Sequence, residues 1–350
     1  MIDLNNLSEI KKLDPKDVLG STNLFTKQCR QIHEIVEKYE FATNISDLED
    51  AKSVIFSGMG GSAYGGHVAS SLFKDEITVP FYVNSDYGLP HFVNCDSLVI
   101  LTSYSGSTEE TLSSLKVANS INANMIGLTS GGALREALEN ESKDVITFDP
   151  IYNPSGQPRL GAGYIVLGTI EILRRLNLIN LATNEVIEAI DEVEKNIDSI
   201  KEKAIDLSKK IQGKIPSIFA GSIFEGNAHI LRNQFNETAK SFASFHFLPE
   251  ANHHVLEGLK NPKDRKLTAL FLDSNLYDSK IKKRMELTQD VVGKNNSEVL
   301  IYQTNGTTKL SQSLELLAFG GYLTFYLAIL YGQDPSLIPW VDYFKEKLAK

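Results

Sequence analysis

A predicted strand and a predicted helix are joined by the stretch Thr102-Ser103-Tyr104-Ser105-Gly106-Ser107-Thr108-Glu109-Glu110-Thr111. The apolar run 98–101 precedes it, and helical periodicity follows it. The hydroxyls of Ser103, Ser105 and Thr108 should therefore face an incoming anion together with backbone N–H groups and the helix N-terminus. For a single hydroxyl the alternative is a capping box with Ser105 or Ser107 as the N-cap residue. Three hydroxyls at one junction favour a phosphate cradle.

The first half of the chain alternates strands with helical segments. Strands are predicted at 54–56, 79–83, 98–101, 125–128 and 145–148. This alternation is typical of a parallel, doubly wound sheet, in which ligands gather at the carboxyl ends of the strands. The stretch Gly58-Met59-Gly60-Gly61-Ser62 follows the first strand and should lie beside the cradle. Its spacing differs from the dinucleotide pattern G-x-G-x-x-G, so a nicotinamide cofactor is not expected.

The second half of the chain repeats the pattern. The stretch 216–222 resembles 54–58, and it is followed by predicted strands at 267–272 and 298–302 and predicted helices at 225–240, 279–292 and 313–331. It lacks the hydroxyl triplet, so only the first half should hold an anion. The fold class expected is α/β: two doubly wound, parallel-sheet domains of the flavodoxin-like sandwich type, with N- and C-terminal helices. The expected divisions are a helical segment 1–50, a first domain 51–183, a solvated linking helix 184–210, a second domain 211–335 and a C-terminal helix 336–350.

Composition excludes several classes of partner. The chain has 350 residues and a formal net charge of −9, and no basic run is interleaved with aromatics, so nucleic acid is not expected. Cys29 and Cys95 form no metal or disulfide spacing, which favours a reducing, cytoplasmic location. The N-terminus shows no signal-peptide pattern. The apolar run 314–331 is interrupted by Glu315 and by glycines, which indicates a core helix rather than a membrane span.

Several residues could do chemistry. Glu237 lies in a helical segment, where partial burial would raise its pKa toward that of a base. Periodicity alone favours an ordinary surface glutamate paired with Lys240 or Arg232. Arg159 lies on a turn-rich loop ahead of a helix and is either solvent-exposed or closes over a ligand. His253 and its neighbour lack the spacing of a zinc site, although Asp and Glu residues elsewhere leave a metal site open at this point.

Taken together, these motifs resemble the bifunctional phosphoglucose/phosphomannose isomerases, which contain two sugar-isomerase (SIS) domains. The resemblance is carried, in the family's order, by 58–62, 103–111, 158–159, 236–240 and 252–253. It implies reversible aldose–ketose isomerisation of glucose 6-phosphate, and of mannose 6-phosphate, with fructose 6-phosphate through a cis-enediol, without a cofactor or a metal. The alternatives are a non-catalytic SIS protein that binds a sugar phosphate and an amino-sugar-phosphate isomerase. The latter would normally carry an amidotransferase domain, which this sequence does not show.

The resemblance also implies roles for individual residues. Gly61 and Ser62 would line the sugar site, and the cradle hydroxyls would hold the phosphate. Arg159 would stabilise the enediolate, and Glu237 would move the proton between C2 and C1. His253 would assist ring opening from the neighbouring subunit of a homodimer. A C-terminal lysine belongs to the family's site, and we assign it to Lys345, with Lys347 and Lys350 as alternatives.

The sequence departs from the family pattern at three places. Ser107 and His254 stand where relatives usually carry asparagine, and the segment 334–336 ends in Ser336 where many members show Thr-Pro. Serine tolerates the turn at position 107 as asparagine does. The missing Thr-Pro weakens the expectation of activity on mannose 6-phosphate.

Overall fold

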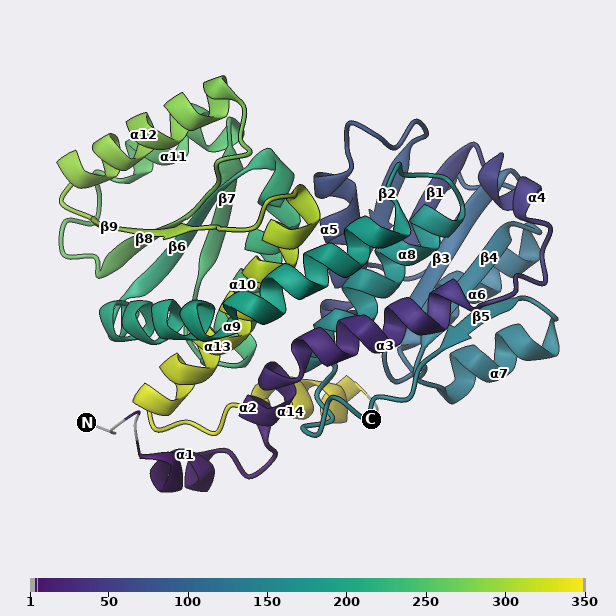
Figure 1. Ribbon diagram of the computed structural model, residues 1–350, viewed down its shortest axis with the longest axis horizontal. Coiled ribbons are helices and arrows are strands. Elements are labelled where there is room, and N and C mark those ends of the chain that lie inside the picture. The colour runs from purple at the N-terminus through teal and green to yellow at the C-terminus, as the bar shows by residue number, and fades with distance from the viewer. Residues whose placement is uncertain (1–3, 5, 349–350) are drawn as a thin grey trace.

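Two parallel sheets form the framework of the computed structural model, which describes residue 4 and residues 6–348 (Figure 1). The five strands of the first sheet are β1 (Ser53–Ser57), β2 (Phe81–Asn84), β3 (Ser97–Ser103), β4 (Asn124–Thr129) and β5 (Asp144–Thr147). They lie in the order β2-β1-β3-β4-β5. The four strands of the second sheet are β6 (Ile215–Gly221), β7 (Ser244–Leu248), β8 (Leu267–Asp273) and β9 (Glu298–Gln303). Their order, β7-β6-β8-β9, is the same order without a fifth strand. Two α/β domains with parallel sheets, as expected, are therefore confirmed.

Helices connect and cover the strands. Those of the first half are α1 (Leu7–Leu13), α2 (Val18–Asn23), α3 (Phe25–Glu37), α4 (Ile45–Glu49), α5 (Tyr64–Leu72), α6 (Glu109–Ser120), α7 (Gly132–Asn140) and α8 (Gly168–Arg175). Those of the second half are α9 (Thr183–Ile211), α10 (Glu225–Glu237), α11 (Val255–Gly258), α12 (Ser279–Lys294), α13 (Lys309–Leu330) and α14 (Pro339–Leu348). Short helical turns at Gly60–Ala63, Pro158–Leu160 and Glu250–His253 lie outside these helices.

The two domains share one hydrophobic core. Helices α9 and α13 pack along each other in the middle of the molecule (Figure 1). Helix α13 is the one helix in the described part of the chain that is long and apolar enough to cross a membrane, and its apolar window is wholly buried in the protein. Helices α5 and α10 join the domains at close range: a Cβ on Gly226 would lie 2.2 Å from the carbonyl oxygen of His67. Each helix follows the first strand of its own sheet, so this contact brings corresponding parts of the two domains together.

Three local expectations differ from the structure. The helix predicted to reach residue 240 ends at Glu237, because Lys240 adopts a left-handed backbone with φ +51°. The strand β7 was not predicted. The helix α9 is not simply solvated, since residues along one side, including Val186, Val193 and Ile200, are buried.

Candidate functional site

The predicted phosphate cradle forms where β3 passes into α6. The Oγ of Ser103 lies 2.8 Å from Oγ1 of Thr108, and the Oγ of Ser105 lies 3.0 Å from that of Ser107. The hydroxyls of Ser103 and Thr108 are therefore in direct contact, whereas that of Ser105 contacts Ser107. The N-cap residue of α6 is Thr108, and its side chain makes no capping hydrogen bond. The capping-box alternative with Ser105 or Ser107 is therefore wrong. The first backbone N–H groups of α6 receive no capping hydrogen bond from the N-cap side chain.

The glycine-rich turn after β1 lies against the cradle and against Arg159. The Oγ of Ser62 accepts a hydrogen bond of 2.9 Å from the backbone N–H of Tyr104, and the hydroxyl of Thr102 donates to the carbonyl of Ser62. Ser62 is buried, so it ties the turn to the cradle while its own hydroxyl proton stays available to a ligand. A Cβ on Gly61 would lie 3.1 Å from both the N and the Cα of Arg159. Glycine therefore permits this close approach of two loops.

Arg159 is buried between the two domains, with 3 % of the residue exposed. Its Nη2 donates to the carbonyl oxygens of Pro335 (2.8 Å) and Ser336 (3.0 Å), and its Nε donates to Oγ1 of Thr238 (3.2 Å). Its Nη1 donates to Oε1 of Gln157 and lies 3.8 Å from Oε2 of Glu237. Of the two possibilities left open by the sequence, the solvent-exposed one is wrong.

Glu237 occupies the last position of α10. Burial raises the pKa of this carboxyl group, while the charges of Arg159, Lys345 and Lys240 oppose the rise. A carboxylate with a raised pKa beside a guanidinium has the properties of a general base next to a stabiliser of negative charge. The alternative of an ordinary surface glutamate paired with Lys240 or Arg232 does not describe this environment.

Glu237 opens into a cleft of about 870 Å³ that lies between the end of α10 and the C-terminal tail. The cleft is also lined by Lys240, Phe242, Asp334 and Trp340. Its volume is in the range that accommodates small-molecule ligands. Apolar side chains on its rim are unusually exposed, since Trp340 is 82 % and Phe242 is 73 % exposed.

The C-terminal lysines differ in their surroundings. Lys345 on α14 acts electrostatically on Glu237. The ammonium of Lys347 lies over the ring of Tyr343, 5.4 Å from its centroid. Lys350 lies outside the described residues. These surroundings favour Lys345 among the three.

His253 lies apart from this group of residues. It ends the helical turn Glu250–His253 after β7 and is exposed. Among residues 4 and 6–348 no hydrogen bond or ion pair joins its ring to another side chain. The structure of the single chain therefore brings Arg159, Glu237 and Lys345 together, but not His253.

Sequence reasoning missed Lys240 as part of this site. Its Nζ donates to the carbonyl oxygens of Asp334 (2.6 Å) and Thr238 (3.1 Å). The only signal in the sequence is that Lys240 follows Glu237 by three residues. If the helix continued, this spacing would predict a surface ion pair between the two side chains. The sequence gives no sign of which tail carbonyl groups Lys240 and Arg159 bind, because every residue has a backbone carbonyl group.

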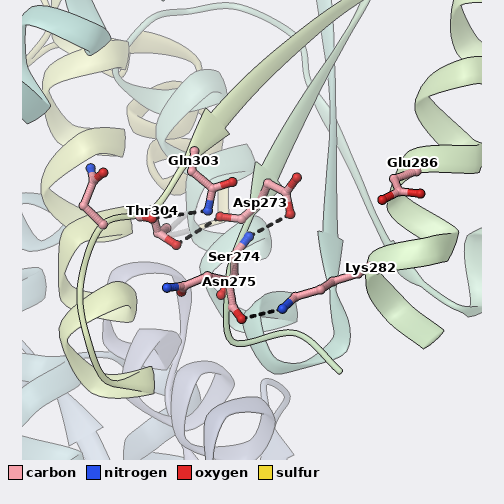
Figure 2. A pocket seen from close by; sticks show the side chains of 8 residues that line it. Asp273, Ser274, Asn275, Lys282, Glu286, Gln303 and Thr304 are labelled. Atoms are coloured by element: carbon pink, nitrogen blue, oxygen red, sulfur yellow. Dashed lines mark hydrogen bonds between the residues drawn. The ribbon is translucent and has the colours of Figure 1, made fainter. Parts of the chain in front are cut away.

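A separate pocket lies at the carboxyl ends of β8 and β9 (Figure 2). Its position in the second sheet corresponds to the position of the cradle in the first sheet. It has a volume of about 460 Å³ and contains the carboxylates of Asp273 and Glu286. The ammonium of Lys282 donates to the carbonyl of Asn275 at 2.6 Å (Figure 2). Carboxylates repel a phosphate group, which supports the expectation that only the first half holds an anion. Within the described residues no group of three or more His, Cys, Asp or Glu side chains is placed to hold a metal ion.

The paired parallel domains and the hydroxyl-rich cradle define a class of protein, the SIS-domain proteins. Residues 47–139 match the family model described as SIS domain, and residues 200–348 match the model described as bacterial phospho-glucose isomerase C-terminal SIS domain. A solved structure of a hypothetical protein from Thermus thermophilus has the same fold, with a TM-score of 0.74 at 15% identity, covering 98% of this chain and 94% of that one.

Curated relatives identify the particular family. The bifunctional phosphoglucose/phosphomannose isomerase of Caldicellulosiruptor bescii is 34% identical over 333 residues, which cover 91% of this chain and 96% of that protein. The protein of the same name from Aquifex aeolicus is 30% identical over 327 residues, covering 91% and 99%. The chain belongs to the family of bifunctional phosphoglucose/phosphomannose isomerases, as its motifs predicted.

Proposed function

We propose that this protein is an enzyme that interconverts glucose 6-phosphate and mannose 6-phosphate with fructose 6-phosphate. The single observation that carries the proposal is the pairing of the partly buried carboxylate of Glu237 with the guanidinium of Arg159 at 3.8 Å. The family's name describes the same reaction. The sugar phosphate is held by the cradle, and the chemistry takes place at this pair.

The roles follow from what aldose–ketose isomerisation requires. Ser103, Ser105 and Thr108 bind the phosphate, with the N-terminus of α6 adding favourable partial charge. Glu237 takes the proton from C2 and returns it to C1, while the proton on the C2 oxygen moves to the C1 oxygen. The two epimers differ only at C2, so both give the same cis-enediol.

Arg159 offsets the negative charge that develops on the oxygens of this intermediate. Lys345 adds a second positive charge near Glu237. Charge stabilisation by these two side chains requires no metal ion, and we propose a metal-independent reaction. The cytosol, where two free cysteines stay reduced, is the location we propose.

His253 is supplied, in this proposal, by the second subunit of a homodimer. It is exposed and has no partner side chain within the described part of its own chain. Apolar side chains that a partner could cover are present on α14, where Trp340, Tyr343 and Phe344 are all more than half exposed. The histidine would assist opening of the sugar ring before Glu237 acts.

The test is conversion of fructose 6-phosphate into the two aldose phosphates in the presence of excess chelator. The wild type should be active, and Glu237→Gln should lose roughly 10²–10⁴-fold in kcat. Glu202→Gln, a substitution of the same kind on the exposed side of α9, should keep full activity. Near wild-type rates for Glu237→Gln would disprove its role as the base, and tight binding of the sugar phosphate without any turnover would favour a non-catalytic binding protein.

A further inference from the structure

Two cations from different domains hold three consecutive carbonyl groups of the C-terminal tail. Lys240, which follows α10, donates to the carbonyl of Asp334 at 2.6 Å. Arg159, which follows β5, donates to the carbonyls of Pro335 and Ser336. The tail 331–338 leads directly into α14, which carries Lys345. The start of α14 is therefore fixed relative to Glu237 by both domains.

The backbone at Lys240 directs its side chain toward the tail. Its φ of +51° lies in the left-handed region, which residues other than glycine seldom adopt. Its ammonium also donates to the carbonyl of Thr238 at 3.1 Å, so the side chain folds back over the end of α10. Unusual backbone conformations of this kind persist where the surrounding contacts fix them, often at functional sites.

The carboxylate of Asp334 is not the partner of Lys240. Its Oδ1 accepts hydrogen bonds from the backbone N–H and the hydroxyl of Ser336, at 2.7 and 2.6 Å. Lys240 therefore binds the peptide group itself, and within residues 4 and 6–348 no carboxylate forms a direct ion pair with it. That charge acts on Glu237.

We propose that Lys240 is a positioning residue of the isomerase: its ammonium anchors the tail so that Lys345 lies near Glu237. The proposal rests on the proposed function of Glu237 as the base. The charged and titratable groups that face Glu237 are Arg159, Lys240, Lys345 and Tyr64. Burial lowers the pKa of Lys240 to about 8, with the charge of Arg159 acting in the same direction, so most of its positive charge is present at neutral pH.

The experiment measures kcat and KM for fructose 6-phosphate as functions of pH in three variants. Lys240→Met removes the hydrogen bonds and the charge, and kcat should fall roughly 10²-fold because the catalytic groups are misplaced. The acid limb of the kcat/KM profile should move to higher pH, because loss of a nearby positive charge raises the pKa of Glu237. Lys240→Arg should restore most of the rate and the position of the limb.

Lys240→Gln separates the two contributions. Its amide can still donate to the carbonyl of Asp334 but carries no charge. Limited proteolysis of the tail 331–338 should therefore show protection for Lys240→Gln and faster cleavage for Lys240→Met. The pH profile of Lys240→Gln should still be displaced. The matched control is Lys294→Met, on α12 outside this cleft, whose ammonium pairs with Asp290 at 2.6 Å and which should leave tail and rate unchanged.

A double-mutant cycle completes the test. If Lys240 acts through the tail, combining Lys240→Met with Lys345→Met should lower kcat little more than the worse single variant. Fully multiplicative losses, or a Lys240→Met enzyme with the wild-type rate, pH profile and tail protection, would overturn the proposal. If the proposed role of Glu237 as the base were wrong, the result would be different, because the Glu237→Gln enzyme would remain active.

Discussion

The Nη1 atom of Arg159 lies 3.8 Å from Oε2 of Glu237, and this contact joins a loop of the first domain to the end of α10 in the second. The same guanidinium binds the C-terminal tail through Nη2. One side chain therefore holds the proposed base, both domains and the tail in one arrangement. Burial lowers the pKa of Arg159, while the charge of Glu237 opposes that change, so the two groups favour each other's ionised forms.

Replacing Arg159 with lysine should lower kcat/KM by about 10²–10³-fold. Lysine keeps a positive charge but cannot donate in several directions from a planar group, so the contacts to the tail and to Thr238 are lost together. Steady-state kinetics with fructose 6-phosphate measure the effect. Arg135→Lys, at an exposed ion pair with Glu139 on α7, is the control and should have no effect. An active Arg159→Lys enzyme would show that position and hydrogen bonding at Arg159 matter little.

Ser105→Ala should weaken binding of the phosphate without slowing the chemistry. The KM for fructose 6-phosphate should rise roughly tenfold, since a hydrogen bond to a charged group is lost, while kcat should stay close to wild type. Ser120→Ala, at the other end of α6, should change neither value. A fall in kcat with an unchanged KM would contradict the assignment of this hydroxyl to ground-state binding.

Mixing two inactive variants should restore activity if His253 acts across a dimer. In a heterodimer of Glu237→Gln and His253→Ala subunits, one site combines the intact Glu237 of one chain with the intact His253 of the other. Random exchange of subunits should therefore recover about a quarter of the wild-type rate. The control is each variant refolded alone. No recovery, with subunit exchange verified by mass spectrometry, would mean that the histidine acts within its own chain or not at all.

The closely packed, tilted rings of His67 and His229 should make stability sensitive to acid. Their centroids lie 4.0 Å apart between α5 and α10, and burial lowers the pKa of His67 to about 4 and that of His229 to about 3. Both values lie below the 6.5 of an unfolded histidine. The unfolded chain thus binds more protons below pH 6.5, and the free energy of unfolding should fall as the pH is lowered toward the folded-state values.

Urea unfolding at several pH values measures this effect. The loss should approach about 1.4 kcal/mol per histidine for each pH unit below 6.5. The double variant His67→Phe/His229→Phe keeps two aromatic rings at these positions and should lose this part of the pH dependence. Arg232, which lowers both pKa values further, is left in place. An unchanged slope in the double variant would assign the acid sensitivity to other groups.

The sequence contains the information for some parts of this site and not for others. The cradle could be predicted because Ser103, Ser105 and Thr108 lie within one short junction, where local pattern specifies both structure and chemistry. The burial of Glu237 could not, since its neighbours Arg159 and Lys345 lie far away in the chain and only the fold brings them close. The resemblance to a family predicted the roles of Glu237, Arg159 and Lys345, which helical periodicity alone could not predict.

Two failures have local physical causes. The helix α10 was extended too far because nothing in the residue type of Lys240 signals a left-handed backbone. Strand β7 was missed because Ser244 to Phe247 are only partly buried and the strand is five residues long. Short strands at the edge of a sheet give a weak periodic signal.

Arg159 and Lys240 bind the C-terminal tail through its backbone carbonyl oxygens. Every amino acid supplies the same backbone carbonyl oxygen. The side chains at positions 335 and 336 can therefore be replaced while the hydrogen bonds from Arg159 remain. Ser336, whose hydroxyl is bound to Asp334, marks one such position. Natural variation can therefore change the side chains of the tail at these positions without disturbing the architecture that holds the base.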